Sequence, residues 1–99
     1  MTLAAAGNNA HREAAIAHVR QLLDLFRQQP DQAAVAPLIE LAEHLERAVT
    51  AFHMEAIRFR MFSLDRALKS ATLPAAVAET FDAVRQDLEA AGFHTRSHA

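Results

Sequence analysis

Between Pro37 and Pro74 the chain reads LIELAEHLERAVTAFHMEAIRFRMFSLDRALKSATL (residues 38–73), with no glycine and no proline. Nearly every residue in this stretch is a good helix former. As one helix it would be about 54 Å long, at a rise of 1.5 Å per residue. The stretch therefore predicts an all-α protein, a helical bundle of three helices with a long central helix.

The flanking segments predict one shorter helix on each side. The first helix is expected to follow a flexible arm (residues 1–8), capped by Asn8 or Asn9, and to end near Gln28 before Pro30. Asp31 can cap a turn ahead of the long helix, and Pro37 suits that helix's first turn.

The third helix is expected to begin after a Thr72 cap and to bury Val77, Phe81, Val84, Leu88 and Ala91. Gly92 and Phe93 have the pattern of a helix C-terminus, and residues 94–99 are expected to form a flexible tail. The whole chain, residues 1–99, is interpreted as a single domain.

Apolar residues of the long helix form two stripes on a helical wheel. The main stripe, which we expect to form the core within the chain, consists of Leu38, Leu41, Ala42, Leu45, Ala48, Val49, Phe52, Ala56 and Phe59. The second stripe consists of Met54, Ile57, Met61, Leu64 and Leu68, with Phe62 at the flank of the main stripe. A helix that is apolar on two sides needs cover on two sides, and one short helix covers only one.

These stripes predict self-association, most simply a homodimer. The expected interface consists of Met54, Ile57, Met61, Phe62, Leu64 and Leu68.

Within the chain, the first helix is expected to pair with the proximal half of the long helix. The third helix, rich in acidic residues, is expected to pair with the distal half, which carries Arg58, Arg60, Arg66 and Lys69. The alternative is that the long helix breaks near Ser63 or Ser70 and that the second stripe folds inward in a compact monomer.

Glu55 lies near Phe52, Phe59 and Phe62, close to the main stripe. A partly buried carboxylate sometimes marks a catalytic site. An ion pair with Arg58, with Arg66 or with an arginine of another chain is the commoner explanation, and we adopt it here.

The remaining composition excludes several classes of function. Without cysteine there can be no disulfide, thiolate metal site or cysteine nucleophile, and no phosphate-binding loop or serine-histidine-aspartate arrangement is visible. The net charge of −2 gives no reason to expect nucleic acid, and no window of about 18 residues is free of charge, so no membrane span is expected. We therefore predict a cytoplasmic, non-catalytic interaction protein without metal or cofactor, whose partner is itself and, as a further candidate, another protein.

The competing interpretation is a bundle that binds a metal or a small molecule through histidine and glutamate side chains. Its candidates are Glu40, Glu43, His44 and Glu46 on the long helix and His11 and His18 on the first helix. Metal sites in bundles use inward Glu-x-x-His units, and this sequence contains none. His53, between the two stripes, is interpreted as a boundary residue, and His94 and His98 lie in the expected tail.

Overall fold

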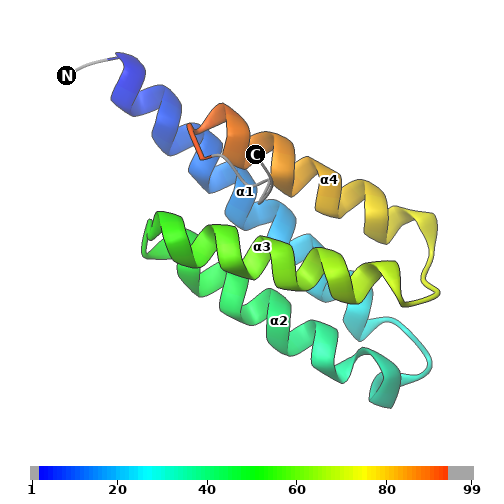
Figure 1. The fold of residues 1–99 in the computed structure, drawn as a ribbon. Coiled ribbons are helices and arrows are strands. Elements are labelled where there is room, and N and C mark those ends of the chain that lie inside the picture. Colours follow the sequence, from blue (N-terminus) through cyan, green and yellow to red (C-terminus); the bar gives the residue numbers. More distant parts are fainter. Residues whose placement is uncertain (1–2, 94–99) are drawn as a thin grey trace.

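The computed structural model describes residues 3–93, and its side chains from residue 9 onward. The chain forms four helices, α1 (Leu3–Arg27), α2 (Gln32–Thr50), α3 (Met54–Lys69) and α4 (Ala75–Ala90), with no strand in the described part. Figure 1 shows them side by side as a bundle, with the N-terminal end of the longest helix, α1, projecting beyond its neighbours. The all-α prediction is confirmed, but there are four helices where three were expected. No described helix combines the length and the apolarity needed to cross a membrane.

The predicted long helix is broken at residues 51–53. Phe52 has a φ of 59°, in the left-handed region that glycine usually occupies at this position of a helix end. The backbone N–H of His53 donates to the carbonyl of Ala48 (3.2 Å), and that of Phe52 donates to Val49 (3.0 Å). This pair of hydrogen bonds is the Schellman arrangement, which ends a helix by satisfying its last carbonyls. The continuous helix was therefore a wrong prediction, and the break lies ahead of both Ser63 and Ser70.

His53 begins the next helix directly after this turn. Its Nδ1 accepts a hydrogen bond from the backbone N–H of Ala56 (3.1 Å), and its own carbonyl accepts from Ile57 (2.9 Å). A side-chain acceptor at this position satisfies one of the orphan N–H groups of the first helical turn. The same histidine thus closes the end of α2 and caps α3, so α3 can reverse direction and run back alongside α2.

The reversal changes which stripe of the distal half forms the core. Ile57, Met61 and Leu64, from the second stripe, are 1%, 1% and 0% exposed and belong to the core. Phe52 and Phe59, from the main stripe, are 48% and 58% exposed. The prediction that both phenylalanines lie in the core is wrong, and the alternative in which the second stripe folds inward is the arrangement observed. In α2 the main stripe behaves as expected, with its central residues buried (Leu38, Ala42, Leu45, Ala48 and Val49).

The fourth helix packs against a different partner from the one predicted. α1 packs against α2 and α4, and α2 packs against α3, whereas α4 makes little close contact with α3. His18 Nδ1 of α1 donates a hydrogen bond to Asp87 Oδ2 of α4 (2.6 Å), so one acidic residue of α4 that was expected to face α3 faces α1 instead. The ion pair between α3 and α4 joins Asp65 to Arg85 (3.6 Å), which reverses the predicted order of charges.

Some helix ends lie where the sequence predicted them, and others do not. Asp31 caps α2 as predicted, accepting from the N–H of Ala34 (3.1 Å), but Pro37 lies inside α2 because the expected turn is already helical. α1 begins at Leu3, so Asn8 and Asn9 lie within it, and residues 3–8 are helical rather than an arm.

At α4 the start differs from the prediction, while the buried positions and the end agree with it. Pro74, not Thr72, stands at the N-terminus of α4. The five predicted apolar positions of this helix and its end are buried (Val77, Phe81, Val84, Leu88 and Ala91). Gly92 (φ 99°) and Phe93 form a second Schellman turn, in which the N–H of Phe93 donates to Leu88 (2.8 Å). The predicted tail, with His94 and His98, lies outside the described residues.

Candidate interaction surface

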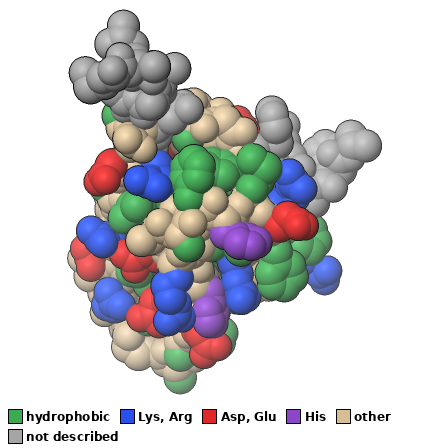
Figure 2. All heavy atoms as spheres, turned by 90° about the vertical axis from the view of Figure 1, so that its left-hand side faces the viewer, with side chains coloured by type: hydrophobic (Ala, Val, Ile, Leu, Met, Phe, Trp, Pro, Cys, Tyr) green, Lys and Arg blue, Asp and Glu red, His purple; other side chains and the backbone are tan. Residues whose placement is uncertain are grey.

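The large exposed hydrophobic side chains of the described chain are confined to one short segment. Phe52, Met54, Phe59 and Phe62 are 48%, 46%, 58% and 41% exposed, and all lie between positions 52 and 62. Figure 2, which views the molecule from the end that carries the α2–α3 turn, shows hydrophobic side chains at the surface among basic and acidic ones. Clustered exposure of this kind marks interaction sites more often than isolated exposed residues do.

Four of the exposed residues of α3 share one side of the helix. Glu55, Phe59, Phe62 and Arg66 are separated by four, three and four positions, a spacing that places them in one row, and we call this row the α3 outer face. It lies opposite Ile57, Met61 and Leu64, which is why it points to solvent. The Arg66 guanidinium lies 5.8 Å from the centre of the Phe62 ring. Phenylalanine and arginine are both enriched at protein interfaces relative to the rest of the surface.

The predicted interface residues are divided between core and surface. Met54 and Phe62 are exposed, and Leu68 is partly buried. Ile57, Met61 and Leu64 are inside the core of the single chain and cannot meet a partner while the chain is folded. The sequence analysis did not group Glu55, Phe59 and Arg66 with Phe62 as one surface. Their spacing of four, three and four positions along α3 was the signal that could have predicted it.

A second exposed aromatic group lies at the α2–α3 turn. The ring of Phe52 meets that of Phe93 edge to face, with 5.0 Å between centroids, and the Arg12 guanidinium lies 5.1 Å from the Phe52 ring. The Nε of Arg12 is buried without a hydrogen-bond partner in the described structure, and a cation this close to an aromatic ring is attracted to it. These contacts join α1, the α2–α3 turn and Phe93, which follows α4.

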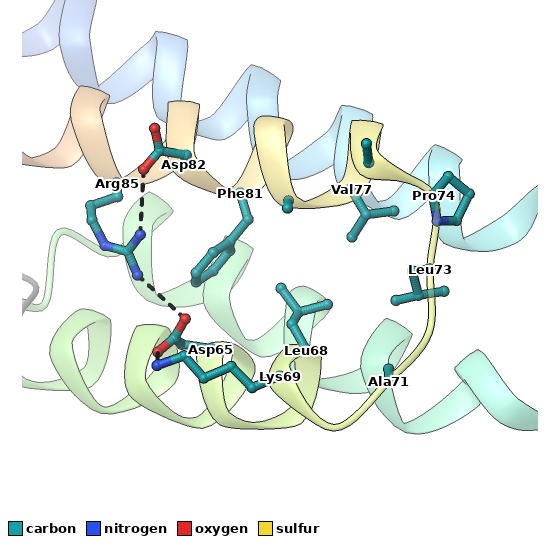
Figure 3. A pocket seen from close by; sticks show the side chains of 12 residues that line it. Asp65, Leu68, Lys69, Ala71, Leu73, Pro74, Val77, Phe81, Asp82 and Arg85 are labelled. Atoms are coloured by element: carbon teal, nitrogen blue, oxygen red, sulfur yellow. Dashed lines mark ion pairs between the residues drawn. The ribbon is translucent and has the colours of Figure 1, made fainter.

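An open groove separates α3 from α4 because these two helices diverge. Figure 3 shows Leu68 of α3 and Phe81 of α4 pointing into it, with Leu73 and Pro74 of the connecting loop at one end. The groove encloses about 370 Å³, within the range of small-molecule sites. At its other end Arg85 pairs with Asp65 and Asp82 (3.6 and 3.5 Å), so the groove has an apolar floor and a charged rim.

Three of the six candidate metal ligands, Glu43, Glu46 and His18, are engaged in contacts between helices. Glu43 and Glu46 of α2 pair with Arg27 and Arg20 of α1 at 3.3 and 2.6 Å. His18 of α1 donates a hydrogen bond to Asp87 of α4. Within α2, His44 Nδ1 accepts a hydrogen bond from Arg47 (3.1 Å). Glu40 and His11 are exposed. Among the residues that the structure describes, no three histidine or carboxylate side chains converge as a metal site would require.

Comparison of the chain with protein-family models, with curated proteins and with solved structures finds no match in any of the three.

Proposed function

We propose that this protein is a non-catalytic interaction module that self-associates through the α3 outer face. One observation carries the proposal: the exposed large hydrophobic side chains all fall within residues 52–62, while the rest of the described apolar residues of similar size are wholly or partly buried. Phe59 and Phe62 are 58% and 41% exposed, so leaving them uncovered forgoes about half of the roughly 1.5–3 kcal/mol that full burial of such a side chain contributes. A partner that covers both recovers that free energy.

The polar residues around this surface support a protein partner. Arg60 lies over the Phe59 ring (5.1 Å) as Arg66 lies over Phe62, so each phenylalanine is flanked by a cation. A hydrophobic centre within a charged rim is the usual anatomy of a protein interface. Another protein with a similar surface is a further candidate partner, and a cytoplasmic location stays a prediction from the sequence.

The test is the molecular mass in solution as a function of concentration. Light scattering of the unmodified protein should give a mass that rises above 10.9 kDa as the concentration increases through the micromolar range. The double variant Phe59→Ser, Phe62→Ser should remain monomeric and helical. A matched control, Ala33→Ser with Ala36→Ser on the exposed side of α2, should associate like the unmodified chain. An unmodified protein that stays monomeric at millimolar concentration would refute the proposal.

The groove between α3 and α4 favours a second candidate function, the binding of a small apolar molecule with one charged end. Its volume and its charged rim, formed by Asp65, Lys69, Asp82 and Arg85, support this proposal. The exposed Ala78 lines the groove, so Ala78→Phe should fill it without disturbing the core. An anionic hydrophobic dye should bind the unmodified protein and not this variant. Equal dye binding by both proteins would argue against the groove.

A further inference from the structure

The α3 outer face has a symmetry that identifies its partner and the direction of binding. Glu55 precedes Phe59 by four residues, and Arg66 follows Phe62 by four. Read in reverse, the face presents the same pattern with its charges exchanged. We propose that two copies of this chain pair through α3 in antiparallel orientation, about a twofold axis between Phe59 and Phe62. This inference rests on the proposed function and adds the identity and geometry of the partner.

Antiparallel pairing brings complementary groups together twice. In a twofold interface, if residue i of one copy meets residue j of the other, then j meets i as well. Here Phe59 meets Phe62 of the second copy, and Glu55 meets Arg66, each contact occurring on both sides of the axis. Parallel pairing would instead place glutamate against glutamate and arginine against arginine, which is unfavourable. The charges of the face therefore select the antiparallel arrangement.

The spacing also suits helix pairing. Positions 55, 59, 62 and 66 follow the alternating steps of four and three that form the contact row of a two-helix coiled coil. All four residues are exposed in the single chain, so no rearrangement of the core is needed for contact. α3 has 16 residues, about 24 Å at 1.5 Å per residue, which makes the contact short. We expect reversible association that depends on concentration.

The absence of cysteine from the sequence allows a direct test of this geometry. Glu55→Cys and Arg66→Cys are made separately, with a size tag on one of them, and mixed under mild oxidation. Antiparallel pairing predicts disulfide-linked heterodimers between positions 55 and 66. Homodimers of Glu55→Cys should form poorly, because eleven residues of helix separate the two positions by about 16 Å along the axis, and a disulfide spans Cα atoms at most about 7 Å apart. Glu79→Cys, exposed on α4, measures cross-linking by random collision.

Charge exchange gives an independent readout without cross-linking. Glu55→Arg alone and Arg66→Glu alone should each weaken self-association about tenfold, since each places two like-charged pairs in the interface. An equimolar mixture of the two variants should regain the unmodified affinity, because the heterodimer restores both opposite-charge contacts. Circular dichroism of each variant establishes that it remains helical.

The outcomes distinguish this inference from the proposed function. Preferential 55–66 cross-links, together with recovery in the mixture, support the antiparallel pair. Homodimeric 55–55 cross-links, or single variants that associate like the unmodified protein, overturn the antiparallel geometry while leaving self-association intact. A monomeric unmodified protein, with no cross-linking above the Glu79→Cys control, overturns both.

Discussion

Met61→Ala and Phe59→Ala test which side of α3 holds the fold together. The two residues are two positions apart on the same helix, with Met61 1% exposed and Phe59 58% exposed. Replacing a fully buried methionine by alanine typically costs about 2–5 kcal/mol, through lost burial and the cavity left behind. Replacing an exposed side chain changes stability by about 0.5 kcal/mol or less. The larger aromatic residue should therefore matter less to folding than the smaller methionine.

Because the domain is small, the loss caused by Met61→Ala is a large share of its free energy of unfolding. A chain of this size has a free energy of unfolding of about 5–15 kcal/mol. With a urea dependence of roughly 1–3 kcal/mol/M, Met61→Ala should lower the urea midpoint by about 1–3 M. The loss should be the same at two protein concentrations that differ tenfold, since the cavity lies within one chain. Phe59→Ala should leave the midpoint unchanged at the lower concentration and reduce it only at the higher one, where association contributes.

Urea titrations followed by far-ultraviolet circular dichroism measure both effects. Similar slopes for all proteins would show that the midpoints can be compared. Phe62→Ala serves as a second exposed control and should behave like Phe59→Ala. If Phe59→Ala lowered the midpoint by 1 M or more at both concentrations while Met61→Ala affected association alone, the assignment of core and surface on α3 would be wrong.

Three further changes test individual contacts by chemical denaturation. Phe52→Gly should be more stable than Phe52→Ala by about 1 kcal/mol, because both lose the ring but only glycine adopts a φ of 59° without strain; equal stability would argue against the left-handed turn. Gly92→Ala should cost about 1 kcal/mol even though an added Cβ would meet no atom within 4 Å, since its φ of 99° is unfavourable for alanine; an unchanged midpoint would contradict this. Asp87→Asn should cost about 1–2 kcal/mol by weakening the hydrogen bond from His18 Nδ1, and the nitrogen chemical shifts of the imidazole should change with it; unaltered shifts would place the histidine elsewhere.

Local signals in the sequence predicted the helix ends that use ordinary residues. Asp31 caps α2, and Gly92 ends α4 in the conformation that glycine favours. The buried row of α4 also follows directly from its spacing. Each of these features depends on residues within one or two turns of each other, so the sequence contains the information locally.

The break at residues 51–53 could not be recognised in the same way. Its left-handed residue is Phe52 and its capping residue is His53, whereas glycine or asparagine and a short polar residue are usual. A left-handed conformation costs a residue with a Cβ roughly 1–2 kcal/mol. Burying Ile57, Met61 and Leu64 contributes about 1.5–3 kcal/mol each, which exceeds that cost. Tertiary packing therefore determines the break, and packing is not visible in the local sequence.

The same turn explains both the core and the exposed surface. In a continuous helix the stripe that contains Leu45 would also have held Phe52 and Phe59, and the second stripe would have needed a partner. Reversing the chain at Phe52 lets Ile57, Met61 and Leu64 complete the bundle within one chain, and it leaves Phe59 and Phe62 on the outside. A bundle that needed only a core could carry polar residues at these two positions at little cost to its packing, since Phe59 and Phe62 are 58% and 41% exposed. Two phenylalanines, each beneath an arginine and placed symmetrically between Glu55 and Arg66, fit the antiparallel pair of α3 helices that we propose.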